Sequence, residues 1–281
     1  TLSLFVPQIA VQIYTVLDKT MIGQITKDMT EVGYYEQAQK VIKAALTMIT
    51  ALQTVMNSRI ANAYAKKDQK EIKKCLESSF NFVWFLIIPM MFGLIAIATK
   101  FVPWYYGEGF DGVIPIMIAT APILIPIGLS GITGIQYLVQ IGKRKIYTIS
   151  VTVGALINVL LNLVLIHFFD GVGAAIASII AEITILGIQL KYFKDQFSLL
   201  EILKLSTKCL ISGIVMFIVV TLLVNNMSVS IINTAIEIII GIIVYLLMLI
   251  ILKYQFLKDL YSQIIRGIKN KLKGEKQNAS N

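Results

Sequence analysis

The sequence repeats long apolar runs separated by short polar or charged segments. Roughly 20 consecutive apolar residues let a helix cross the hydrocarbon core of a bilayer, and about eight runs of that order occur. They cover residues 2–25, 32–64, 79–99, 113–140, 147–169, 172–192, 207–225 and 232–252. In a chain that is 57% hydrophobic, this pattern predicts an all-α, polytopic helical membrane protein with about eight transmembrane helices.

The positive charges lie mostly on one side of these runs. Of 25 Lys and Arg residues, 19 follow the second, fourth, sixth and eighth runs, whereas Lys27 and Lys100 alone follow the others. The positive-inside rule places the basic side in the cytoplasm. Residues 253–281 are therefore expected to form a basic cytoplasmic tail, and the net charge of +9 reflects topology. No nucleic-acid partner is expected.

The basic segments also contain amphipathic stretches. Residues 68–78, 194–204 and 261–273 alternate lysine with apolar residues, which favours helices lying at an anionic membrane surface. Binding of a partner protein is the alternative. Cys75 and Cys209 have no ligand-like spacing, so we expect free thiols, with no disulfide and no metal site.

The first run carries charges that a membrane helix normally excludes, Asp18 and Lys19. Lys19 continues a stripe of polar residues at helical spacing, formed by Gln8, Gln12 and Thr15. Leu, Ile and Val occupy the other faces. Ionisable residues inside a membrane usually face a cavity or a transport path. We therefore expect this stripe to face water or substrate.

The second run has a polar face along its whole length. Its members recur at helical spacing: Glu36, Lys40, Lys43, Thr47, Thr50, Thr54 and Ser58. A packing seam of small hydroxyl residues is the alternative, but it does not explain the lysines. Because the two runs are antiparallel, the three lysines are expected at one depth, partly neutralised by Asp18 and Glu36. Their remaining positive charge would suit a phosphate group.

Later runs add polar groups and helix breakers. Three prolines and three glycines interrupt residues 113–140, which predicts either a static kink or a gating hinge. Asn158 and Asn162 lie one helical turn apart, and Glu182 shares a face with Ser178 and Gln189. The asparagines and Asp18 could bind Na+, or Asp18 or Glu182 could carry a proton. Hydrogen bonding between helices is the alternative role for the asparagines.

Four stretches resemble a known family. They are FVPQIAVQIYTVLDKTMIG at 5–23, NAYAKKD at 62–68, GKRK at 142–145 and DGVGAAIAS at 170–178. The chain resembles the carboxyl-terminal half of Wzx-type polysaccharide and O-antigen flippases, within the multidrug/oligosaccharidyl-lipid/polysaccharide exporter superfamily. The resemblance covers nearly all of residues 1–270.

The resemblance implies a two-lobe transporter. Residues 1–193 would be the second six-helix lobe, with the first lobe absent from this chain, and residues 194–252 an interfacial segment with two additional helices. The implied function is transport of undecaprenyl-diphosphate-linked oligosaccharide by alternating access. The resemblance further implies that the protein lies in the bacterial cytoplasmic membrane and takes part in cell-surface polysaccharide biosynthesis. No enzyme activity is implied, and we find no catalytic motif in the sequence.

The resemblance also assigns roles to the polar residues. The cationic cavity would comprise Lys19, Lys40 and Lys43, with Gln8, Gln12, Thr15, Glu36, Thr47, Thr50 and Thr54 as further substrate-binding residues. The ion-coupling candidates are Asp18, Asn158, Asn162 and Glu182. No cofactor is expected beyond a coupling Na+ or H+.

The expected partners are the anionic lipid-linked oligosaccharide and membrane lipid, together with a polysaccharide polymerase and glycosyltransferases. A multidrug/cation antiporter of the same superfamily is the first alternative function. A membrane-embedded glycosyltransferase or polymerase is the second, although it would need a larger outer loop than this chain offers.

Overall fold

A computed structural model describes residues 16–225 and 227–257, and every regular element within these ranges is a helix. After a helix at residues 16–26 come α2 (Met29–Ala65), α3 (Gln69–Tyr106), α4 (Val113–Thr120), η1 (Ala121–Ile123), α5 (Leu124–Ser130), η2 (Gly131–Val139), α6 (Arg144–Phe193), α7 (Leu199–Val224) and α8 (Ile231–Ile251). The all-α class is confirmed.

Among the described residues, five helical stretches are long and apolar enough to cross a membrane: α3, the run from α4 to η2, α6, α7 and α8. α2 is not among them, in keeping with its polar face. α6 has 50 residues and folds back on itself, so it supplies two of the expected spans. The expected total of about eight spans stays a prediction.

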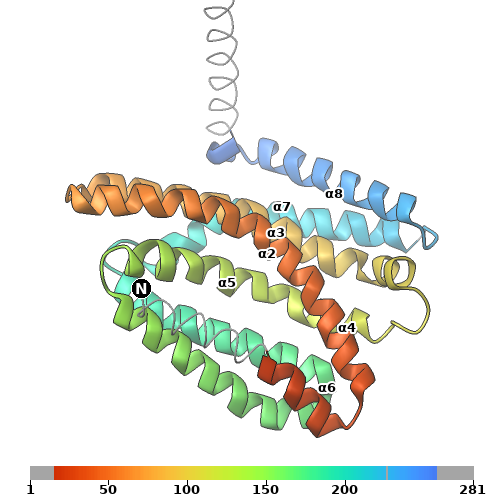
Figure 1. Cartoon of the computed structure of the whole chain (residues 1–281). Coiled ribbons are helices and arrows are strands. Elements are labelled where there is room, and N and C mark those ends of the chain that lie inside the picture. The colour runs from red at the N-terminus through yellow and green to blue at the C-terminus, as the bar shows by residue number, and fades with distance from the viewer. Residues whose placement is uncertain (1–15, 226, 258–281) are drawn as a thin grey trace, which may run out of the picture.

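The helices form layers around α3 (Figure 1). α7 packs on α3, and α8 packs on both of them. The two arms of α6 lie on the other side of the bundle, below α5 in Figure 1. α2 crosses obliquely in front of these layers and contacts α3, α4, η2 and α6. This arrangement places α2 across the run from α4 to η2 and across the two arms of α6. The polar residues of the bundle lie between these elements.

Side-chain caps fix where several helices begin. Asp28 Oδ1 accepts the Thr30 N–H at 2.8 Å and so starts α2, and this bond lowers the pKa of the Asp28 carboxyl. Asp68 caps α3 through the Glu71 N–H at 3.0 Å, and Ser198 forms a capping box with Glu201 at the start of α7.

These caps correct the expected boundaries on the basic side. Residues 69–78 do not form a separate interfacial helix, because Asp68 starts α3 there and the helix continues to Tyr106. Most of the expected segment 194–204 likewise belongs to α7, which begins at Leu199. The third expected stretch, 261–273, lies outside the described residues.

The run from α4 to η2 changes helical type along its length, as its prolines and glycines predict. Pro122 lies in the 3-10 turn η1, and Gly131 begins the π-helical segment η2. Proline lacks the N–H of a regular helical hydrogen bond, and π-helical turns often mark functional sites. The run is therefore kinked, and a hinge at this kink stays a prediction.

α6 is two antiparallel arms that meet at Asp170. The backbone of Asp170 has φ 48° and ψ −131°, which reverses the chain between the expected spans 147–169 and 172–192. Gly173 follows closely, and a Cβ atom there would lie 2.1 Å from the Leu165 carbonyl oxygen. The close approach of the two arms therefore requires glycine at this position.

α8 forms a hydrogen bond with α3 at the turn where a proline interrupts the hydrogen bonding of α3. Pro89 has no N–H to offer the carbonyl of Phe85, one turn earlier. The hydroxyl of Tyr245 on α8 donates to that carbonyl at 3.0 Å. Further along, the Tyr254 hydroxyl donates to the Asn81 carbonyl at 3.1 Å. The two cysteines, as expected, are free, and both are buried.

Candidate functional site

A buried carboxylate is the centre of a polar cluster between the helices. Asp18, on the helix at residues 16–26, is 2% exposed. Its Oδ1 accepts a hydrogen bond from Asn162 Nδ2 at 2.6 Å. Its Oδ2 accepts from the hydroxyls of Tyr35 at 2.9 Å and Ser178 at 3.1 Å. These donors come from α2 and from both arms of α6, so one carboxylate connects four helical segments.

The two asparagines identified from the sequence extend this cluster. Asn162 Nδ2 also donates to Asn158 Oδ1 at 3.2 Å, and Asn158 Nδ2 donates to Ser178 Oγ at 3.1 Å. Both asparagines are fully buried. The Oδ1 of Asn162 has no hydrogen-bond partner among the described residues. Hydrogen bonding between the arms is thus present, and one oxygen stays available to a ligand.

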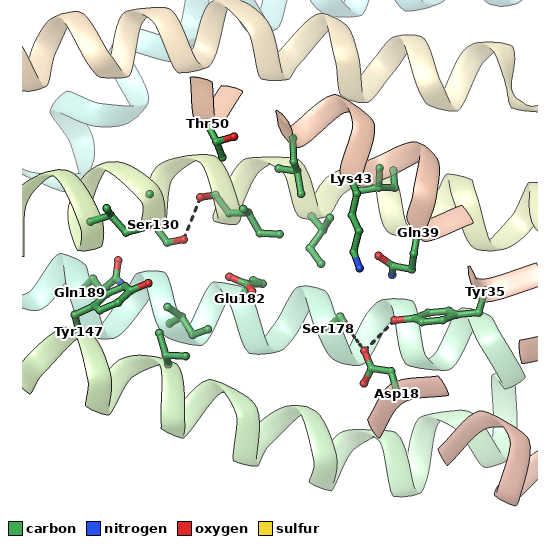
Figure 2. Close-up of a pocket in the computed structure, with 18 residues that line it drawn as sticks. Asp18, Tyr35, Gln39, Lys43, Thr50, Ser130, Tyr147, Ser178, Glu182 and Gln189 are labelled. Carbon is green, nitrogen blue, oxygen red and sulfur yellow. Dashed lines mark hydrogen bonds between the residues drawn. The ribbon is translucent and has the colours of Figure 1, made fainter. Parts of the chain in front are cut away.

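A cavity of about 280 Å³ begins at this cluster and extends along α2, α5, η2 and α6. Figure 2 shows Asp18, Tyr35 and Ser178 at one end, Tyr147 and Gln189 at the other, and Glu182 between them. The lining residues are Asp18, Tyr35, Gln39, Ile42, Lys43, Leu46, Thr50, Ile123, Ile127, Ser130, Gly131, Ile135, Tyr147, Val151, Ser178, Glu182, Ile185 and Gln189.

A second hydrogen-bond chain lies at the end of the cavity away from Asp18. Thr133 on η2 donates to Gln189 Oε1 at 2.6 Å, and Gln189 Nε2 donates to Ser150 Oγ at 3.1 Å. All three side chains are buried. The chain joins the π-helical segment to both arms of α6, so the cavity has a polar link between helices at each end.

The face of α2 that lines the cavity is rotated from the polar stripe expected from the sequence. Tyr35, Gln39, Lys43, Leu46 and Thr50 face the cavity, whereas the expected stripe runs through 36, 40, 43, 47 and 50. The two faces share Lys43 and Thr50. Thr47, outside the cavity lining, donates to the carbonyl of Ala44 on its own helix at 2.6 Å.

The three candidate lysines divide into two groups. Lys43 lines the cavity, and Figure 2 shows its amine directed from α2 toward α6. Lys19 and Lys40 instead share Glu36 Oε1, at 3.3 and 3.7 Å, and do not line the cavity. Glu36 thus takes the neutralising role expected of it. Asp18 was expected to share that role, but it accepts hydrogen bonds from neutral groups.

Some expected residues cannot be placed. Gln8, Gln12 and Thr15 lie outside the described residues, as does the side chain of Thr54. Of the ion-coupling candidates, Asp18, Asn158 and Asn162 meet in one cluster, and Glu182 lies further along the cavity.

Several cavity residues were not among the sequence candidates, including Tyr35, Gln39 and Tyr147. Tyr35 and Gln39 lie eight and four residues before Lys43, so continuing back from Lys43 at strict i, i+4 spacing would have found them. Tyr147 ends the cavity on the first arm of α6. It looks apolar in a sequence pattern, although its hydroxyl can form hydrogen bonds.

These features define the class of protein: a helical membrane protein with a polar, charged cavity within its bundle. Similar folds are found among solved transporters. The chain resembles the lipid II flippase MurJ, in an inward closed conformation, with a TM-score of 0.76 and 25% identity over 92% of this chain and 53% of that one.

Two further solved transporters of the MOP superfamily share the fold at 16% identity. One is from Pyrococcus furiosus, with a TM-score of 0.61 over 79% of this chain and 52% of the other. The second is a multidrug resistance transporter of the MATE family in an outward-facing conformation, with a TM-score of 0.60 over 80% and 53% of the two chains.

Two sequence comparisons match proteins named for glycan or polysaccharide biosynthesis. Residues 1–115 match the family described as polysaccharide biosynthesis protein. The chain is 26% identical over 167 residues to the probable low-salt glycan biosynthesis flippase Agl15 of Haloferax volcanii, covering 59% of this chain and 34% of that protein. These matches support the resemblance to Wzx-type flippases. The matched proteins are named as flippases or transporters, which supports the expectation of a non-enzyme. The chain spans about a third to a half of their length.

Proposed function

We propose that the chain forms one lobe of a flippase for lipid-linked oligosaccharides, with undecaprenyl diphosphate as the lipid carrier. The cargo would cross the cytoplasmic membrane by alternating access, as part of cell-surface polysaccharide synthesis. Residues 1–193 would form the lobe, residues 194–252 an accessory segment with α7 and α8, and residues 253–281 a cytoplasmic tail. The basic loops would face the cytoplasm.

One observation supports this proposal: the cavity inside the bundle contains Lys43, which forms no salt bridge with any described residue. Within the described part of the chain, the salt bridges are those of Lys19 and Lys40 with Glu36. Lys43 is therefore the lysine left to bind an anion in the cavity. A diphosphate group suits an ammonium donor, and an uncompensated cation within a membrane protein is costly unless it has a role.

We assign the coupling cation to the Asp18 cluster. The cluster offers the carboxylate of Asp18, the hydroxyls of Tyr35 and Ser178, and the buried Asn162 Oδ1, which has no hydrogen-bond partner among the described residues. Oxygen ligands of this kind suit a small hard cation. A bound Na+ would supply positive charge next to Asp18, and a proton on the carboxylate would achieve the same neutralisation.

A cellular assay tests the proposed function. Lys43→Ala in the protein that carries this chain should reduce surface polysaccharide at least about tenfold, because the cavity loses its anion partner. Lys40→Ala is the matched control, three residues away on α2 and paired with Glu36, and should retain most of the polymer. Normal polymer in a Lys43→Ala strain with normal membrane levels of the protein would exclude the role given to Lys43.

A multidrug/cation antiporter is the second candidate, because Asp18 and Glu182 also line the cavity and carboxylates suit cationic substrates. Expression in a drug-sensitive host separates the two functions. Resistance that depends on Glu182, together with normal polysaccharide, would favour the antiporter. Loss of polysaccharide without any change in resistance would favour the flippase.

A further inference from the structure

We infer that the coupling cation at Asp18 and the anionic group at Lys43 bind together and that each strengthens the binding of the other. This inference rests on the proposed function, because it concerns the same cavity. It specifies something that the proposed function leaves open: whether cation and cargo co-bind or compete.

Asp18 and Lys43 line one cavity, and within the described residues neither of them forms a salt bridge. Asp18 accepts hydrogen bonds from three neutral groups, supplied by Asn162, Tyr35 and Ser178. Lys43 belongs to no salt bridge within residues 16–225 and 227–257. Both side chains line the same cavity. The carboxylate therefore weakens the positive potential that Lys43 presents to an anion, without binding the ammonium.

A cation at Asp18 cancels that opposing charge. The positive potential at Lys43 then rises, and an anion binds there more tightly. By thermodynamic reciprocity, the anion at Lys43 strengthens cation binding at Asp18 by the same factor. For unit charges roughly 10 Å apart, with an effective dielectric constant of about 20, the factor is about tenfold.

Competition would require a different geometry. If the ammonium of Lys43 were bound to Asp18, an arriving cation would have to displace it. The structure places neutral donors on both carboxylate oxygens instead, and Asp18 is almost fully buried. Lys43 is exposed within the cavity, where it can meet a phosphate group of the cargo.

Pyrophosphate is the probe for the anionic group. Its affinity for the 281-residue chain in lipid nanodiscs would be measured by isothermal titration calorimetry, in sodium buffer and in N-methylglucamine buffer of equal ionic strength. We expect about tenfold tighter binding in sodium. Titration of sodium with and without saturating pyrophosphate should show the same factor. Sodium that weakens pyrophosphate binding would overturn the inference.

Substitutions separate this inference from the proposed function. Asp18→Asn removes the negative charge, so we expect tight pyrophosphate binding in sodium-free buffer and no further gain from sodium. If this variant folds and binds pyrophosphate no more tightly than the wild type without sodium, the inference is wrong. If Asp18→Asn binds pyrophosphate more tightly than the wild type does, and sodium does not change the wild-type affinity, the coupling between the two sites holds with a proton as the cation. If Asp18→Asn does not fold, the wild-type sodium titration decides alone.

Two lysine variants complete the design. Lys43→Gln should lose pyrophosphate binding in both buffers, whereas Lys40→Gln should behave as the wild type does. Wild-type protein that binds no pyrophosphate in either buffer would count against the proposed anionic cargo itself. Binding that depends on Lys43 but not on sodium or on Asp18 would leave the cargo proposal standing and overturn the co-binding inference.

Discussion

Asn162 Nδ2 lies 2.6 Å from Asp18 Oδ1, although the two residues are 144 positions apart in the chain. This bond joins the first arm of α6 to the first described helix inside the membrane protein. Removing a buried donor leaves the carboxylate oxygen unsatisfied, which costs about 1–3 kcal/mol. Asn162→Ala should therefore lower the unfolding temperature in detergent and abolish any stabilisation by sodium.

Asn233→Ala is the control for that substitution. Asn233 donates only to Ser228, at the start of α8, far from the cluster in sequence. It should leave the sodium response unchanged. An Asn162→Ala protein that sodium stabilises as strongly as it stabilises the wild type would show that Asn162 is not a ligand.

The hydrogen bond between the Tyr245 hydroxyl and the Phe85 carbonyl is expected to contribute to stability. Tyr245→Phe should cost about 1 kcal/mol, because it removes the hydroxyl that satisfies the carbonyl freed by Pro89. In a Pro89→Ala background the helix supplies its own N–H to that carbonyl, so the same change should cost clearly less. A double-mutant cycle on thermal or denaturant unfolding measures the difference. Equal costs in both backgrounds would refute the link.

Two glycines on α6 should respond oppositely to alanine. At Gly173 a methyl group would meet the Leu165 carbonyl oxygen, so Gly173→Ala should destabilise the hairpin and reduce the folded yield. At Gly187 no atom of the described residues lies within 4 Å of the added atom. Gly187→Ala should leave stability unchanged or raise it by up to about 1 kcal/mol, because alanine favours helix. Size-exclusion profiles and unfolding temperatures compare the two.

The salt bridges of Glu36 should matter little to stability. Lys19, Lys40 and Glu36 have side chains that are 31%, 59% and 41% exposed, so the solvent weakens their attraction. Glu36→Gln should change the free energy of unfolding by less than about 1 kcal/mol. Unfolding measured at low and high salt checks this, and a large loss that added salt does not alter would contradict the weak, solvent-screened pairing expected here.

The sequence alone was enough to predict the helical class, the kinked run and the cluster of Asp18 with Asn158 and Asn162. Each rests on local information: apolar runs of span length, prolines and glycines, and asparagines one turn apart. Residues on one helix face keep their relation whatever the surrounding fold, so the pair on α6 could be identified without a structure.

The division of the lysines could not be predicted in the same way. Lys40 and Lys43 are less than one turn apart, and the spacing cannot say which of them faces the cavity. That depends on how α2 rotates against α5 and α6, which is a property of packing. The starts of α3 and α7 were missed for a different reason. Their capping residues, Asp68 and Ser198, lie in charged segments that suggested surface helices.

The change from α-helix to π-helix at Gly131 has a consequence for the cavity. A π turn takes more residues than an α turn, so moving the boundary along the chain by one residue rotates every side chain beyond it. Thr133 would then leave Gln189, and the end of the cavity away from Asp18 would lose its link to α6. The local winding of this helix and the hydrogen bond at one end of the cavity therefore change together.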